Sequence, residues 1–196
     1  MQIKHFDPAD IDEVARMASE VWGDREGSEE FTRVFCGHLA RYSCYTPELA
    51  LQLTDEDGLQ AIAFGWMPGD TNDADEWVAS QMAGLSEEER NHVLLNVNYL
   101  KRTDAELQEK MVPGKSAKLS FFISRKPGCG TPLLEKLIGL LCERSVEWLY
   151  LWSDCTCNWQ YYIRHGYEQI GHGTVPEYST PDEDYTYTLF RKRIAL

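Results

Sequence analysis

Basic side chains are scarce in this sequence, where 19 Lys and Arg stand against 32 Asp and Glu and the formal net charge is −13. Proteins that bind nucleic acids neutralise its phosphates with clustered Lys and Arg. We therefore expect no nucleic-acid partner. The charge is compatible with a cationic substrate, although the solubility of the chain alone also accounts for it.

Long hydrophobic runs are absent as well. No stretch approaches the length of a membrane span, and the first residues, "MQIKHFDPADIDEV", contain no apolar signal region. We therefore expect neither a membrane anchor nor secretion, and we predict a cytoplasmic protein. The 43% hydrophobic and 12% aromatic content indicates a chain that folds around a core of its own.

Cysteine spacings that are typical of metal sites or of disulfide scaffolds are also missing. The six cysteines lie at positions 36, 44, 129, 142, 155 and 157. They show neither C-x-x-C pairs nor the density of a disulfide scaffold, and none of the five histidines has metal-ligand spacing. We expect a reduced protein without a bound metal. A redox protein using Cys155-x-Cys157 is disfavoured, because a one-residue gap strains a disulfide.

The elements that are present alternate between strands and helices along one domain spanning 1–196. "QIKHF" predicts a first strand, and Asp7 with Pro8 predicts the start of a helix. Apolar residues spaced as one helical stripe follow: Ile11, Val14, Met17 and Val21. A second helix is predicted from Ser28, and two strands flank the turn residues 55–58.

Residues 70–116 differ from the rest and predict a helical insertion between the third and fourth strands. "GDTNDADEW" is interpreted as a polar connection, and two capping boxes, Ser86 with Glu89 and Thr103 with Glu106, predict two helices. The apolar positions of the segment are too few for a separate core. With the strands and helices that follow, the sequence predicts an α+β fold with a mixed central sheet flanked by helices.

The stretch "FFISRKPGCGTPLLEK" holds the strongest functional signal. A strand there leads through a basic, glycine-rich turn directly into a helix. A helix N-terminus leaves backbone N–H groups unpaired and favours negative charge, and Gly128 and Gly130 let an anion approach that backbone. Arg125 and Lys126 would add charge. A turn that simply needs glycine is the alternative for an isolated G-x-G.

Two motifs together resemble the GNAT N-acetyltransferase superfamily. Residues 125–130, "RKPGCG", match R-x-x-G-x-G of its acetyl-CoA motif, and "YYIRHGY" at 161–167 is similar to its following F-Y-E-x-x-G-[FY] helix. The order of elements is also similar, with the insertion outside it. The resemblance implies a GNAT fold in which strands four and five splay apart to admit the pantetheine arm of the cofactor.

The resemblance also implies roles for individual residues. It assigns the following to acetyl-CoA: Ile123, Arg125, Lys126, Gly128, Cys129, Gly130, Thr131 and Asn158. Tyr162 takes the position of the tyrosine that protonates the departing thiolate, with packing in the core as the alternative, and Tyr161 that of a packing aromatic. Cys155 stands where the commonest pattern has asparagine, so Asn158 either serves the pantetheine or caps a helix. Asp154 is the candidate general base, with a helix N-cap or water-relayed deprotonation as alternatives.

These observations predict a cytoplasmic N-acetyltransferase that moves acetyl from acetyl-CoA to an amine of a small molecule or peptide by direct attack. The alternatives are transfer of another acyl group and a non-catalytic acyl-CoA-binding regulator of the same fold. The insertion either lines the acceptor cleft and favours a cationic amine through Asp70, Asp73, Asp75 and Glu76, or forms a solvated lid or the contact of a homodimer.

Overall fold

The structure, a computed structural model, describes residues 1–23 and 27–195. The strands are β1 (Gln2–His5), β2 (Ala50–Asp55), β3 (Gly58–Trp66), β4 (Ser116–Ser124), β5 (Trp148–Asp154), β6 (Glu168–Thr174) and β7 (Thr186–Arg193). The α-helices are α1 (Ile11–Trp22), α2 (Glu29–Ser43), α3 (Ala74–Gln81), α4 (Glu87–Glu109), α5 (Gly130–Glu143) and α6 (Gln160–Arg164). None of the helices in this part of the chain has the length and apolar character that crossing a membrane takes.

The strands form one seven-stranded sheet in the order β1-β2-β3-β4-β5-β7-β6. β4 and β5 pair in parallel, and the other neighbouring strands pair antiparallel. The predicted α+β class with a mixed sheet is confirmed. The parallel pair requires a crossover connection, and α5 supplies it.

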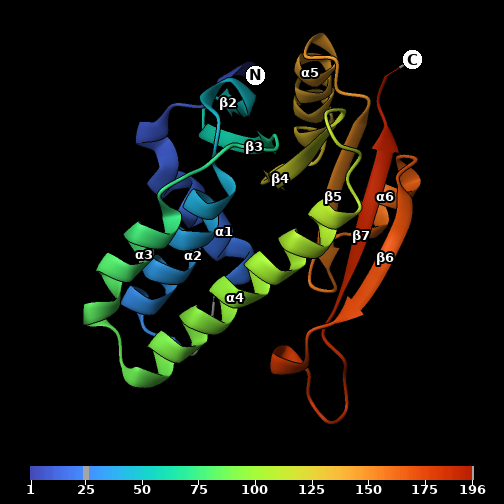
Figure 1. Cartoon of the computed structure of the whole chain (residues 1–196). Helices are drawn as coiled ribbons and strands as arrows, with labels where there is room; N and C mark the ends of the chain where they lie inside the picture. The colour runs from blue at the N-terminus through green and yellow to red at the C-terminus, as the bar shows by residue number, and fades with distance from the viewer. Residues whose placement is uncertain (24–26, 196) are drawn as a thin grey trace.

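Helices cover both faces of this sheet, because alternate side chains of the central strands point to opposite sides. On one face, Leu133 and Leu137 of α5 pack with Leu51 and Leu119. On the other face, α1 and α2 pack over a cluster that includes Ile62 and Phe64 of β3 and Phe121 of β4. α4 crosses in front of the sheet between the α1–α3 group and the β5–β7–β6 side (Figure 1).

The insertion is helical, as predicted, but its internal boundaries differ. α3 begins at Ala74, inside the stretch interpreted as a polar connection, and a single helix α4 runs from Glu87 through Thr103 to Glu109. The capping box at Ser86 is confirmed, since Ser86 Oγ accepts from Glu89 N at 3.2 Å and Glu89 Oε2 accepts from Ser86 N at 2.9 Å. The predicted second start at Thr103 is wrong. No Gly or Pro interrupts the segment before it, so the first helix simply continues.

The first helical region differs from its prediction at one residue. Asp7 accepts from Ala9 N, and the chain enters α1 through a 3₁₀ turn at Pro8–Asp10. Val14 and Met17 are fully buried, but Val21 is 55% exposed and does not complete the predicted stripe. Val21 and Trp22 in the last turn of α1 line the cavity described below.

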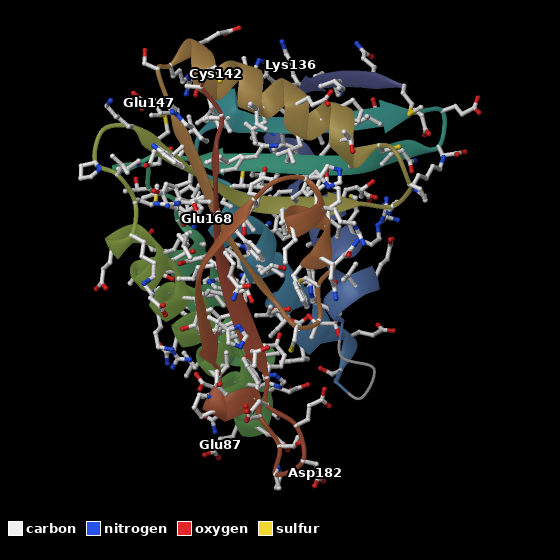
Figure 2. The ribbon with its side chains drawn as sticks, turned by 90° about the vertical axis from the view of Figure 1, so that its right-hand side faces the viewer. Glu87, Lys136, Cys142, Glu147, Glu168 and Asp182 are labelled. Atoms are coloured by element: carbon white, nitrogen blue, oxygen red, sulfur yellow. The ribbon has the colours of Figure 1, made fainter. Side chains whose placement is uncertain are left out.

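The start of α4 and the loop between β6 and β7 lie at one end of the molecule. Figure 2 shows Glu87 and Asp182 there, with Lys136 and Cys142 of α5 at the opposite end. α4 therefore spans the space from this end to the centre of the sheet. Its inner face packs Tyr99, Leu100 and Leu107 against Tyr150 of β5 and Leu189 of β7.

Candidate active site

The centre of the sheet opens where β4 and β5 separate. Their pairing ends at Lys118 and Tyr150, after which residues 119–124 pair with β3 and residues 151–154 with β7. The predicted splaying of these two strands is therefore confirmed. A gap between parallel strands leaves the backbone groups of both strands available for a ligand.

A β-bulge at Ser120 changes the register of β4 inside this opening. Phe121 lies opposite Phe64, but Leu119 lies opposite Gly65, so Ser120 is the extra residue. Arg125 N donates to Gln60 O at 2.8 Å. Because hydrogen-bonding directions alternate along an antiparallel pair, Ile123 also faces β3, while the amides of Phe122 and Ser124 face the opening.

Ile123, which the resemblance assigns to the cofactor, does not present its amide to the opening. Its amide is directed toward the neighbouring strand, and its side chain packs in the cluster under α1 and α2. Ile123 still lines the cavity. The outward amides one residue to either side were missed, because a bulge in β4 cannot be recognised from the alternation of the sequence.

A cavity of about 920 Å³ occupies the opening and extends beneath α4. It is bordered by the splayed ends of β4 and β5, by the turn at residues 125–131, and by side chains of α1, α2, α4 and α6. Its size is within the range of sites for small molecules and cofactors. The cavity thus brings together segments that are far apart in the chain.

The basic side chains of the turn are already paired within the protein. Arg125 binds Glu13 and Glu20 of α1 at 2.6 and 2.5 Å, and Lys126 binds Asp55 and Asp57 of the β2–β3 turn at 3.0 and 2.7 Å. These carboxylates raise the pKa of Lys126 through hydrogen bonds. The two cations hold the turn on its neighbours, a role the sequence did not indicate.

The backbone of the turn, in contrast, has free donors. The amides of Arg125 and Cys129 donate to Gln60 O and Lys126 O. Among the described residues, the amides of Gly128, Gly130 and Thr131 have no acceptor. These N–H groups lie at the N-terminus of a helix of 14 residues, where an anion is favoured.

The two positions of the motif, 128 and 130, are occupied by glycine for different structural reasons. Gly128 has φ +85°, and a Cβ built on it would contact nothing within 4 Å. A Cβ on Gly130 would lie 2.7 Å from Phe122 Cζ, so a side chain here would displace the Phe122 ring where α5 meets β4. Cys129 turns its side chain into the core under α5, and only its backbone belongs to the turn.

Tyr162 lies on α6 at the cavity. Its ring packs against Tyr167 and Phe190, with centroids 5.3 and 5.6 Å away. Its hydroxyl has no hydrogen-bond partner among the described residues, and burial raises the pKa of the phenol, so it keeps its proton at neutral pH. Tyr162 therefore packs in the core and also presents a proton donor to the cavity. Tyr161 packs beside it and stacks on His165 at 3.9 Å.

Asn158 does not cap a helix. The N-cap position of α6 is Trp159, and no side-chain hydrogen bond of Asn158 is present in the described chain. Asn158 is exposed and lines the cavity next to Tyr162. Its amide is available to a ligand. Cys155 is also exposed but lies outside the cavity lining.

Asp154 ends β5 inside the cavity, on the side covered by α4. Its Oδ1 accepts from Thr156 N at 3.0 Å and from Thr156 Oγ1 at 2.6 Å, while Tyr99 OH lies 3.5 Å from Oδ2. The carboxylate therefore shapes a turn and is not the N-cap of α6. Burial is the main cause of the raised pKa of Tyr99 and of Tyr185, and the negative charge of Asp154 is the second cause.

A buried ion pair at the inner end of the cavity was missed from the sequence. Lys118 Nζ lies 2.5 Å from Asp104 Oδ2, and both side chains are about 95% buried. Asp104 also accepts from Trp152 Nε1 at 2.7 Å and from Tyr42 OH at 2.9 Å. A lysine within the apolar strand "AKLSFFI" was the available signal. Its partner comes from the insertion and is not adjacent to it in the sequence.

The acidic cluster predicted to bind the acceptor lies elsewhere. Asp75 pairs with Lys101 at 2.5 Å, and the ring of Trp77 is covered by Arg41 at 4.1 Å. Asp70 accepts from Met67 N and so closes a turn. These two acids do not line the cavity, and neither do Asp73 and Glu76. The insertion does reach the cavity, but through α4, with Asn96, Tyr99, Leu100 and Asp104.

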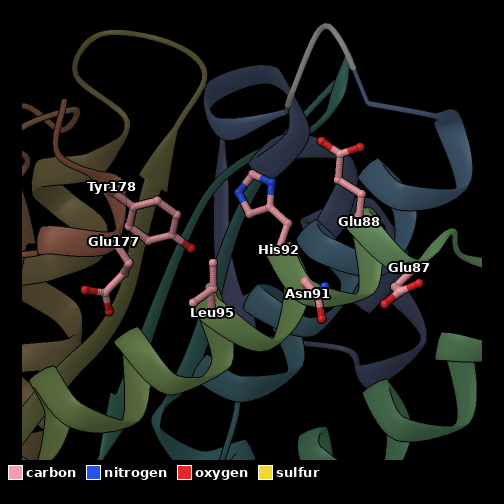
Figure 3. Close-up of a pocket in the computed structure, with 7 residues that line it drawn as sticks. All are labelled: Glu87, Glu88, Asn91, His92, Leu95, Glu177 and Tyr178. Atoms are coloured by element: carbon pink, nitrogen blue, oxygen red, sulfur yellow. The ribbon is translucent and has the colours of Figure 1, made fainter.

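A shallower hollow of about 610 Å³ adjoins the outer end of the cavity (Figure 3). It is lined by Glu87, Glu88, Asn91, His92, Leu95, Glu177 and Tyr178. His92 and Tyr178 also line the larger cavity. Glu177 is paired with Arg102 at 2.7 Å. The hollow is open to solvent.

No cluster of three or more His, Cys, Asp or Glu capable of holding a metal occurs in residues 1–23 and 27–195.

Neither a family model nor a curated protein matches the sequence. Solved structures match it along its whole length. The ribosomal-protein-S18-alanine N-acetyltransferase of Escherichia coli covers 100% of this chain and 94% of its own, with TM-score 0.56 and 15% identity.

Two further structures are similar to the chain. An aminoglycoside 6'-N-acetyltransferase complexed with coenzyme A covers 100% of this chain and 98% of its own, with TM-score 0.57 and 14% identity. A Desulfovibrio desulfuricans protein assigned to the GNAT family covers 99% of each, with TM-score 0.56 and 12% identity. The chain therefore has the GNAT N-acetyltransferase fold, as the two motifs predicted.

Proposed function

We propose that this protein transfers an acetyl group from acetyl-CoA to the amine of a small molecule. The observation that carries the proposal is one cavity in which the splayed strands, the free amides at the start of α5 and the unpaired hydroxyl of Tyr162 meet. The fold shared with N-acetyltransferases, one of them holding coenzyme A, supports it. Because identity to these proteins is low, the residues themselves must be tested.

The cofactor fits the donors that the chain offers. The amides of Gly128, Gly130 and Thr131 would hold its pyrophosphate, and Gly128 leaves open space beside them. Asn158 would bind the amide groups of the pantetheine arm. The amides of Phe122 and Ser124 would bind and polarise the thioester carbonyl between β4 and β5. When bound, acetyl-CoA supplies an acyl group activated as a thioester.

The chain then provides two proton positions. Asp154 Oδ2 takes a proton from the ammonium of the acceptor, which makes the nitrogen nucleophilic. As the new C–N bond forms and the C–S bond breaks, the Tyr162 hydroxyl would donate its proton to the departing sulfur. The second proton of the acceptor nitrogen would then pass through solvent to the tyrosinate and restore its hydroxyl. Most of the acceleration comes from holding the amine and the thioester together in a cavity shielded from water.

The experiment follows release of free CoA thiol with a chromogenic disulfide, using purified protein, acetyl-CoA and a panel of small amines and peptides. Amine-dependent thiol release with N-acetylated product, identified by mass spectrometry, supports the proposal. Binding of CoA without thiol release for any amine overturns it in favour of a non-catalytic acyl-CoA-binding protein. Faster release from propionyl-CoA than from acetyl-CoA would instead show that another acyl group is transferred.

A further inference from the structure

The part of the cavity beneath α4 has walls of aromatic rings. Tyr99 lies against Trp152, Tyr178 and Tyr185, with ring centroids 5.4, 5.7 and 6.2 Å away, and Tyr178 lies 5.3 Å from Tyr185. All four rings line the cavity. Aromatic faces attract a cation that comes within about 6 Å of the ring centroid.

Asp154 is a charged group beside these rings, in contact with Tyr99. It is 8% exposed, and no Lys, Arg or His of the described residues forms an ion pair with it. Its Oδ1 is satisfied by Thr156, but the 3.5 Å contact from Tyr99 to Oδ2 is long for an O–H···O bond. Oδ2 can therefore accept a strong hydrogen bond from a ligand.

Asp104, the other carboxylate in the described lining, is different. It already has Lys118, Trp152 and Tyr42 as partners. Buried carboxylates are normally paired with a cation, and Asp154 alone in this lining lacks one. The cavity therefore offers one negative charge to a ligand.

One part of the lining is apolar. Trp22, Phe35, Leu39 and Phe121 line the cavity and belong to the cluster under α1 and α2. An acceptor with several ammonium and hydroxyl groups would bury polar groups here without partners, which is costly. A flat apolar body would instead replace water along these side chains.

We infer that the acceptor is a small primary amine with a single ammonium and an aromatic or similarly apolar body. Its ammonium binds Asp154 Oδ2 among the four aromatic rings, and its body lies along the apolar wall. This inference rests on the proposed function, since it names the substrate class for the same cavity. It disfavours polycationic sugars and peptide N-termini as acceptors.

The test is isothermal titration of the CoA-saturated full chain with 2-phenylethylamine, and separately with its neutral isostere 2-phenylethanol. Kanamycin and a tetrapeptide with a free N-terminus are titrated for comparison. We expect 2-phenylethylamine to bind most tightly, and the alcohol to bind about 10- to 100-fold more weakly, because it lacks the charge-assisted bond. Asp154→Asn should weaken amine binding by a similar factor. Asp73→Asn, an exposed acid outside the cavity, should not.

Equal binding of the amine and the alcohol, or unchanged affinity in a folded Asp154→Asn protein, overturns the inference. Tighter binding of kanamycin or the tetrapeptide also overturns it. The comparison of amine with alcohol needs no variant, so it decides the question even if Asp154→Asn does not fold. Affinity for CoA alone, titrated first, separates the two claims: CoA that binds with no binding of the aryl amine refutes the acceptor class, while absence of CoA binding refutes the proposed function.

Discussion

Replacing Lys118 by Met should destabilise the protein substantially, although no activity is required to see it. Met keeps the length and apolar stem of the side chain and removes the ammonium. Asp104 would then be a buried carboxylate whose partners are the neutral donors of Trp152 and Tyr42. Removing one partner of a buried ion pair costs about 3–5 kcal/mol.

The structure places the expected value at the lower end of that range. The two remaining donors still bond the charged carboxylate of Asp104 and contribute about 1.5–3 kcal/mol each. The ammonium also lies 5.5 to 5.9 Å from the ring centroids of Tyr42, Tyr45 and Trp66, and those contacts disappear with it. We expect a loss of about 3 kcal/mol, which is a large part of the 5–15 kcal/mol typical of a folded domain. For a chain of this length it corresponds to a fall in Tm of about 6–12 °C.

The control is the double variant Lys118→Met with Asp104→Asn. An asparagine at 104 can accept from Trp152 Nε1 through Oδ1 and donate to the Tyr42 hydroxyl through Nδ2, so no buried charge remains. We expect the double variant to unfold within about 1 kcal/mol of the original protein, because neutral replacements of buried pairs are well tolerated. Urea unfolding at pH 7, followed by tryptophan fluorescence, measures all the free energies. A loss below about 1 kcal/mol for Lys118→Met, or additive losses in the double variant, would refute the reasoning.

Three further predictions address the site and one interhelical contact. Tyr162→Phe should lower kcat for acetyl transfer by about 10²-fold or more with little change in CoA affinity; full activity in steady-state assays would leave Tyr162 a packing residue only. Gly128→Ala should weaken CoA binding at least about 10-fold by calorimetry, since its methyl enters the space beside the free amides. Gly114→Ala, which carries similar backbone strain at φ +70° outside the cavity, should bind CoA normally, and equal losses would contradict the assigned site. Hydrogen bonds from Ser28 and Ser86 lower the pKa of Glu89 from 4.5 to about 2, so its stabilising effect is present above pH 4.5 and is lost as the pH falls toward 2. Glu89→Gln should therefore reduce the loss of stability as the pH falls from 4.5 toward 2. An acid titration followed by circular dichroism that gives the same unfolding curve for the variant and the original protein would show that Glu89 is not responsible.

The strands and most helices followed from local signals. The turn residues 55–58 marked the boundary between β2 and β3, and the capping residue Ser28 marked the start of α2. The predictions failed where the role of a residue depended on more than its local sequence. The Thr103–Glu106 pair has the form of a capping box, but a cap acts only where a helix begins, and α4 was already continuous there. The acids at residues 70–76 were correctly noted as clustered, but their bonds to turns and to Lys101 depend on contacts that no local pattern encodes.

By itself, the sequence determined the order of elements, the glycine-rich turn before α5, and the tyrosine of α6, because each depends on residues close together in the chain. Only the tertiary structure decided how those pieces meet. It separated β4 from β5 beyond Lys118, placed a bulge at Ser120, and paired Lys118 with Asp104. It also left Asp154 among aromatic rings from α4, β5 and the segment after β6. Burial and pairing of charges are properties of surfaces brought together by folding, and residues distant in sequence supply both sides of each contact.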